Sequence, residues 1–178
     1  NDSTINSLFK KFKDLADKKK QIFEEDLLAI ADSEQNSSNK NIIEFVDLSL
    51  KCGHKCKAEA LIKINYFGKK ISKRSDGNGP IDSIFNAIKK IIPNKASLVL
   101  YQVNAITKGT DAQAEVNVRL QESGISVLGQ GSDIDTMVAS AKAYINALNK
   151  LILKRKKMEE SKNSLSNRHH KNVDKHVI

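Results

Sequence analysis

Two patterns of hydrophobic and polar residues alternate along this chain. From Phe45 onward, apolar residues recur at every second position, which indicates strands with one buried face. The repeating sets are Val46, Leu48, Leu50 and Cys52 for a first strand, and Ala58, Ala60, Ile62 and Ile64 for a second. A turn at Phe67-Gly68 and a third strand through Ile71 follow. The period then becomes helical, with an apolar stripe from Ile81 to Ile92.

The same cycle then restarts. Alternating positions predict two more strands, with the faces Val99, Tyr101, Val103, Ala105 and Ala112, Ala114, Val116, Val118, Leu120. A third strand passes through Val127, and a helical stripe runs from Ile134 to Leu148. We therefore predict two βββα units, 45–92 and 97–150, related by a pseudo-two-fold axis. The expected fold class is α+β, with antiparallel sheets and helices packed on one face.

A sequence match between the units supports a duplication. Ala58-Glu59 matches Ala114-Glu115 and Gly68 matches Gly124 at an offset of 56, while Gly77 and Gly79 match Gly129 and Gly131 at 52. Each glycine pair predicts a strand-to-helix junction, where free helix N–H groups can hold a carboxylate or phosphate. We interpret Asp135 as a helix cap, and Asp82 equally well as a cap or a ligand-binding group.

The flanking segments differ in composition from the repeats. Residues 8–31 have mostly helical spacing and predict two short helices, the second beginning near Asp17 or Lys18. Residues 32–44 are expected to form a flexible polar linker, and 153–178 a basic disordered tail. Because the chain does not begin with Met, we expect a fragment of a longer protein.

Charge and apolar runs limit the function classes. The net charge is +9, but from Leu151 onward 8 Lys/Arg stand against 3 Asp/Glu, so more than half of the excess lies in the tail. With 5% aromatic residues there are few stacking platforms for RNA, and we expect no nucleic-acid partner. No apolar run suits a membrane span or signal peptide, so we expect no membrane association and a cytoplasmic location.

One short segment suggests a metal. Cys52, His54 and Cys56 are closely spaced, as in zinc sites, but no second Cys/His pair follows. We favour a strand end and turn with reduced thiols, and expect no metal or cofactor here. A nucleotide-binding enzyme would rest on the glycine pairs alone, without the third glycine of a dinucleotide fingerprint.

Particular residues indicate a family. Tyr101-Gln102-Val103, the run from Thr107 to Val116, and the run from Gly129 to Leu151 resemble the C-terminal regulatory domain of 2-isopropylmalate synthase. The run from Gly77 to Ile88 fits the same domain. The run from Phe9 to Leu27 resembles the family's helical linker, which implies that 1–31 is part of a helical linker subdomain. The resemblance covers about 8–152.

This resemblance implies a regulatory role. The family condenses acetyl-CoA with 2-oxoisovalerate in a metal-dependent barrel, in leucine biosynthesis, and leucine inhibits it by binding the regulatory domain at a dimer interface. Nothing in the sequence resembles that barrel, so we expect no catalytic residues in this fragment. The implied partners are L-leucine, a second copy of the chain and the barrel of the same parent chain.

The resemblance also implies a leucine pocket. Its residues would be Asn78, Gly79, Ile81, Asp82, Leu98, Tyr101, Ala105, Ala112, Ala114, Gly131, Ser132 and Asp133. Small alanines leave room for an isobutyl group, and helix N–H groups can hold the α-carboxylate. Alternatively, Ala112 and Ala114 are small only to admit a helix, and Tyr101 is a core aromatic.

Two functional alternatives remain open at this point. The regulatory domain of citramalate synthase, which responds to isoleucine, resembles the same segments. A basic α+β RNA-binding module belongs to another class and would need exposed aromatic residues on a strand face. The strands carry mostly alanine and aliphatic residues instead.

Overall fold

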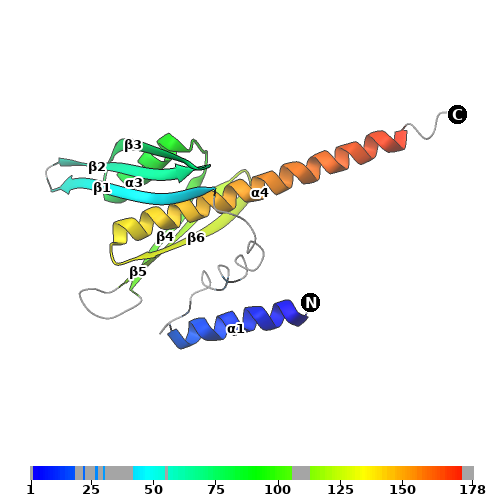
Figure 1. Ribbon diagram of the computed structural model, residues 1–178, viewed down its shortest axis with the longest axis horizontal. Coiled ribbons are helices and arrows are strands. Elements are labelled where there is room, and N and C mark those ends of the chain that lie inside the picture. The colour runs from blue at the N-terminus through cyan, green and yellow to red at the C-terminus, as the bar shows by residue number, and fades with distance from the viewer. Residues whose placement is uncertain are drawn as a thin grey trace.

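The computed structural model describes residues 2–18, 22, 27, 30, 42–54, 56–105 and 113–173. After α1 (Asp2–Lys18), the first unit consists of β1 (Ile43–Gly53), β2 (Cys56–Tyr66), β3 (Lys69–Gly77) and α3 (Pro80–Ile91). The second consists of β4 (Ser97–Ala105), β5 (Ala114–Glu122), β6 (Ile125–Asp133) and α4 (Thr136–Val173). Each unit has a three-stranded antiparallel sheet in chain order, which confirms the predicted α+β fold (Figure 1).

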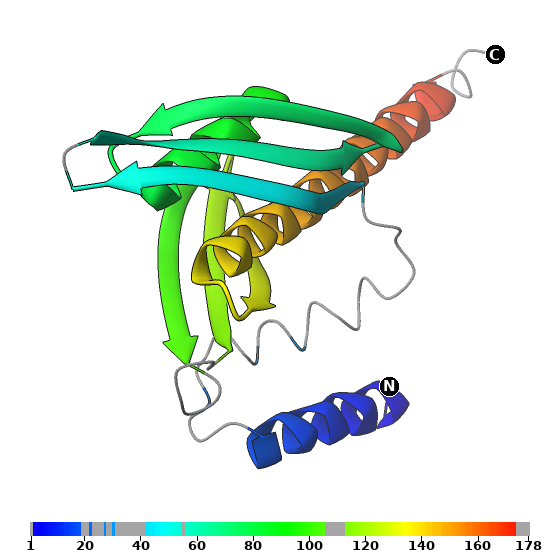
Figure 2. The same cartoon turned by 60° about the vertical axis from the view of Figure 1, so that its left-hand side comes forward.

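The two units share one core. α3 packs on β2 and β3, and α4 packs on β5, β6 and β1, so that α4 runs between the two sheets in both views (Figures 1 and 2). Ile62 of one sheet and Val118 of the other are fully buried in the same cluster. Where the helices meet, the rings of Phe85 and Tyr144 stack with centroids 4.3 Å apart. Burial raises the pKa of the Tyr144 phenol to about 12.

The duplication is visible in matching backbone details. Phe67-Gly68 and Ser123-Gly124 both have positive φ, at 49° and 80° in the first turn and 49° and 79° in the second. Such values suit the tight turn of a two-residue hairpin and favour glycine at the second position. The first strands also share an irregularity, because the register shifts at Val46 in β1 and at Val99 in β4.

These bulges correct two predicted strand faces. Val46 and Val99 were expected to face the core, but each occupies the extra position of a bulge and is 40% and 53% exposed, respectively. The alternation restarts after the bulge, since Leu48 lies opposite Ile62 and Tyr101 opposite Val118. One added residue changes which side chains point inward.

The matching of the glycine pairs is also wrong. Ala58 lies opposite Gly77 and Ala114 lies opposite Asp133, so Gly77 is equivalent to Asp133, not to Gly129. The offset of 56 that relates Gly68 to Gly124 therefore holds through the whole strand and into the helix. The apparent match arose because the glycines lie at different positions along two equivalent strands, β3 and β6.

The flanking segments are described only in part. α1 begins at Asp2 and ends at Lys18, in agreement with a helix ending near Asp17. Most of the predicted second helix and most of the 32–44 linker lie outside the described residues. β1 begins at Ile43, two residues before the predicted Phe45.

Beyond the second unit, α4 continues as helix to Val173, within the stretch 153–178 that was expected to be a disordered tail. This segment contains no Gly or Pro to end the helix and many strong helix formers. Among the described helices, none is long and apolar enough to cross a membrane.

Candidate functional site

The first junction is held together by its own side chains. Gly79 is the N-cap of α3 in an extended conformation, and Pro80 occupies the first helical turn, where its missing N–H costs little. Oδ2 of Asp82 accepts a hydrogen bond from the backbone N of Asn78 at 2.9 Å, and Oγ of Ser83 donates to the carbonyl of Pro80 at 2.7 Å. The Asp82 carboxylate is exposed and fixes the turn that precedes the helix.

The second junction uses two aspartates in different ways. Asp135 caps α4, because its Oδ1 accepts a hydrogen bond from the backbone N of Met137 at 2.7 Å. Asp133 accepts from the backbone N of Asp135 at 3.0 Å, and its other oxygen pairs with Nζ of Lys142 at 2.7 Å. The hydrogen bond from Lys142 lowers the pKa of Asp133. The cap predicted at Asp135 is confirmed.

The glycines near this junction serve helix packing. Gly129 and Gly131 lie inside β6, before the junction itself. A Cβ at Gly129 would lie 2.2 Å from the carbonyl oxygen of Ala143, and one at Gly131 would lie 2.3 Å from that of Ala139. The two glycines let β6 lie directly under α4, whereas a Cβ at Gly79 would meet nothing within 4 Å.

Several predicted residues gather at one end of the second sheet. Ala105 lies opposite Ala114, and Ala114 lies opposite Asp133. Ser132 and Gly131 are next to Asp133 on the same strand. Ala112 lies outside the described residues. This end of the sheet adjoins the start of α4, because β6 ends at Asp133 and α4 begins at Thr136.

Leu98 does not belong to that group within one chain. It lies opposite Leu120, at the far end of β4, and seven residues at about 3.3 Å each separate it from Ala105 by about 23 Å. Tyr101 lies between them. Its hydroxyl hydrogen-bonds Oγ of Ser140 at 2.8 Å, and its ring meets the ring of Phe85 edge-on with centroids 6.1 Å apart. Ile81, one turn before Phe85, is half-buried against the core.

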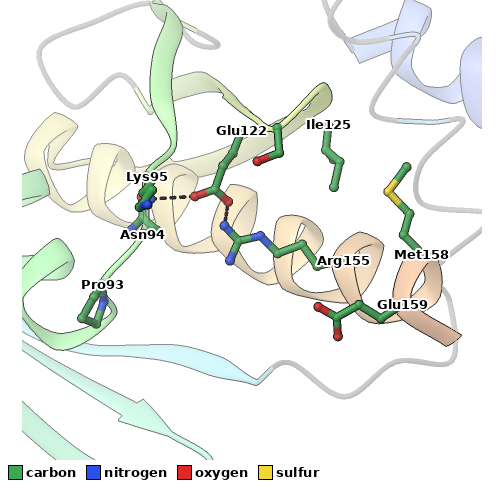
Figure 3. A pocket seen from close by; sticks show the side chains of 9 residues that line it. Pro93, Asn94, Lys95, Glu122, Ile125, Arg155, Met158 and Glu159 are labelled. Atoms are coloured by element: carbon green, nitrogen blue, oxygen red, sulfur yellow. Dashed lines mark hydrogen bonds and ion pairs between the residues drawn. The ribbon is translucent and has the colours of Figure 1, made fainter. Parts of the chain in front are cut away.

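A pocket lies elsewhere in the fold. It has a volume of about 620 Å³, and its walls come from the α3–β4 connection, the β5–β6 turn and α4 (Figure 3). At its base, the buried Glu122 accepts a hydrogen bond from the backbone N of Lys95 at 2.6 Å and pairs with Arg155. None of the twelve predicted residues lines this pocket. The Glu122–Arg155 ion pair joins β5 to α4.

Two structural side chains were missed by the sequence reasoning, namely Glu122 and Asn149. Asn149 is buried in α4; its Oδ1 accepts from the backbone N of Ile42 and of Ile43 at 3.0 and 2.9 Å, and its Nδ2 donates to the carbonyl of Ile43 at 2.8 Å. One amide therefore fixes the start of β1. The sequence did carry a signal for this role, because Asn149 lies four residues after Ile145 and therefore on the apolar stripe of the helix.

The two cysteines lie at the surface. Cys52 and Cys56 are free and exposed at the β1–β2 hairpin. Among the described residues, no group of three His, Cys, Asp or Glu side chains is arranged to hold a metal ion.

These features define a class of protein: a duplicated βββα domain with a shared core and strand-to-helix junctions closed by their own side chains. The chain belongs to the family of LeuA allosteric (dimerisation) domains, which matches residues 21–152.

Curated relatives carry the name 2-isopropylmalate synthase. The protein of Methylorubrum populi is 48% identical over 150 residues, which cover 84% of this chain. Those of Bradyrhizobium sp. strain ORS 278 and Rhodopseudomonas palustris strain BisA53 are each 46% identical over 153 residues, or 86% of this chain. The matched region spans 29% of the length of each of these relatives.

Proposed function

We propose that this chain is the regulatory part of a 2-isopropylmalate synthase and binds L-leucine for feedback inhibition of leucine biosynthesis. The observation that carries the proposal is the family match over the whole duplicated domain, together with relatives of that name. The condensation of acetyl-CoA with 2-oxoisovalerate would belong to a barrel elsewhere in the parent protein, which would be cytoplasmic.

The ligand would lie at the end of the second sheet. Ala105, Ala112 and Ala114 leave room for the isobutyl group, with Leu98, Tyr101 and Ile81 as further apolar walls. The first-turn N–H groups of α3 or α4, other than that of Met137, which Asp135 already caps, would hold the α-carboxylate near Asn78 and Gly79 or near Gly131, Ser132 and Asp133. Asp82 would attract the ammonium group, because its carboxylate is exposed and near a chain turn.

Inhibition would work by population shift. Leucine stabilises the arrangement of the domain that it binds more tightly, and it shifts the equilibrium only by that difference in affinity. The coupling is reciprocal, so the inhibited arrangement of the parent enzyme must also bind leucine more tightly.

Isothermal titration calorimetry tests this proposal. The 178-residue chain should bind L-leucine saturably, and L-isoleucine and D-leucine more weakly. Ala105→Leu should weaken leucine binding at least ~10-fold, because a single bulky group in a shaped apolar pocket costs 1–3 kcal/mol. Ala105 is exposed, so the variant should fold normally.

The matched control is Cys52→Leu, which enlarges an exposed residue at the equivalent end of β1. It should leave leucine binding unchanged. The proposal fails if the wild-type chain, shown to be folded and dimeric, releases no binding heat with leucine. Tighter binding of L-isoleucine would instead assign the domain to the citramalate synthase type.

A further inference from the structure

The pocket beside the β5–β6 turn is separate from the proposed leucine site. That site lies where β5 begins, at Ala114, whereas the pocket lies where β5 ends, at Glu122. Eight residues at about 3.3 Å each put about 26 Å between the two ends of the strand. The α4 wall of the pocket also lies beyond residue 152, where the matched family domain ends, and consists of Arg155, Met158 and Glu159. The continuation of α4 therefore creates the pocket.

A buried ion pair forms the base of the pocket. Glu122 is only 6% exposed, and its carboxylate accepts the backbone N–H of Lys95 and pairs with Nη2 of Arg155 (Figure 3). A guanidinium has five N–H donors, so the pair with Glu122 leaves donors for a further acceptor. Because Glu122 already fixes the guanidinium, an incoming anion would meet a cation that is held in place.

Two charges of opposite sign at this pocket have no ion-pair partner among the described residues. They are the ammonium of Lys95, on the α3–β4 connection, and the carboxylate of Glu159, on α4; both residues are exposed. Arg155 lies four residues before Glu159, a spacing that allows an ion pair along a helix, but Arg155 turns to Glu122 instead. Two cations and one free carboxylate therefore surround the same cavity.

Apolar side chains complete the lining. Pro93 and the buried Ile125 contribute two walls, and Met158, which is 54% exposed, contributes a third. The methionine side chain adapts its shape to what it contacts. The volume of about 620 Å³ lies within the range of small-molecule sites, about 300–1,000 Å³, which combine apolar walls with a few fixed polar groups.

We propose that this pocket binds a small zwitterion, namely an α-amino acid with an apolar side chain. Its α-carboxylate pairs with Arg155 and Lys95, and its α-ammonium pairs with Glu159. Its side chain lies against Ile125 and Met158. A carboxylic acid or an amine with the same side chain would leave one of these charges unpaired, so the pocket selects ligands that carry both. The inference does not depend on the proposed leucine site, since none of the twelve residues of that site lines this pocket.

Methyl NMR of the 178-residue chain tests the inference, because the sequence has two methionines and each reports on a different site. Met158 lines the pocket, and Met137 lies in the first turn of α4, beside the proposed leucine site. The probes are L-leucine, L-isoleucine, L-valine and L-methionine at up to about 10 mM, which detects millimolar affinities. At least one probe should shift the Met158 signal saturably.

The carboxylic acid and the amine with the same side chain as that probe each lack one charge. Both should bind at Met158 at least ~10-fold more weakly, because a charge-assisted contact is lost. A Met158 signal that none of the four amino acids moves, or that the carboxylic acid moves at the same concentration, would overturn the inference.

A pair of variants tests the role of Glu159. Glu159→Gln should weaken binding at Met158 at least ~10-fold, because the α-ammonium loses its anion. Glu160→Gln is the matched control, since Glu160 is also an exposed glutamate of α4 but does not line the pocket; it should bind as the wild-type chain does. Circular dichroism checks that both variants are folded. Equal binding by the two variants would contradict the assigned site.

The Met137 signal keeps this inference distinct from the proposed function. A shift of Met137 alone on addition of all four amino acids would support the leucine site and refute the pocket. A shift of Met158 alone would support the pocket and count against the leucine site.

Discussion

At the residue scale, the second junction depends most on Asp133. This carboxylate is 29% exposed, accepts a hydrogen bond from the backbone of Asp135 and pairs with Lys142, and the pairing lowers its pKa. A carboxylate with a lowered folded-state pKa stabilises the fold above the unfolded-state pKa, and this stabilisation is lost as the pH falls. The junction should therefore be weakest in acid.

We expect Asp133→Asn to destabilise the chain at pH 7 by less than about 1 kcal/mol, as is usual for partly exposed ion pairs. The difference from wild type should shrink as the pH falls below 3.8, the ordinary aspartate value, because the wild-type carboxylate then becomes neutral as well. Urea unfolding at several pH values measures this. A difference that stays constant down to pH 2 would contradict the assigned ion pair.

Some single residues were predictable from the sequence and others were not. The cap at Asp135 follows from an aspartate just before a helical stripe. Glu122 and Asn149 act on backbone groups far away in the chain, at Lys95 and at Ile42, and no local pattern reports such partners. That the twelve residues named in the sequence analysis bind L-leucine stays a prediction.

At the scale of elements, the close contact between β6 and α4 depends on two glycines of β6, which have no side chain to separate the strand from the helix. Gly129 and Gly131 face alanines of α4, so the helix and the strand meet backbone to backbone. Alternation in the sequence was enough to predict all six strands and both helices of the repeat. It could not reveal the bulges at Val46 and Val99, because a bulge changes the phase of the alternation without leaving a gap.

Gly131→Ala should destabilise the chain by about 1–3 kcal/mol, since its Cβ would lie 2.3 Å from a backbone oxygen that cannot move alone. Gly79→Ala is the matched control. Its φ of −160° suits any residue and its surroundings are open, so the change should cost less than about 1 kcal/mol. Thermal unfolding compares the two. Equal losses would show that the close approach of β6 to α4 is not the cause.

At the scale of the whole molecule, Asn149 connects the last helix to the first strand. Its three hydrogen bonds at Ile42 and Ile43 hold the point at which the chain enters the domain. Any movement of α4 relative to its sheet would therefore displace Ile42 and Ile43. These three hydrogen bonds, here called the Asn149 clamp, physically link α4, which begins beside the proposed ligand site, to the segment that precedes the domain.

Asn149→Ala should lower stability by about 3 kcal/mol, because buried backbone groups lose their partners. Hydrogen exchange at the amides of Ile42 and Ile43 should accelerate more than exchange elsewhere. Asn146→Ala on the same helix is the control, since the buried Oδ1 of Asn146 has no hydrogen-bond partner among the described residues. Unchanged exchange at Ile43 in a folded Asn149→Ala variant would contradict the clamp.

The stacked rings of Phe85 and Tyr144 have a consequence for synthesis of the protein. Phe85 belongs to the first unit and Tyr144 to the last helix, so the first unit cannot complete its core until α4 has been made. Chains usually fold domain by domain as they leave the ribosome. Here the core of the first unit forms only once α4 has been synthesised. A nascent chain that stops after α3 should therefore expose apolar core residues and be bound by chaperones or cleaved by proteases.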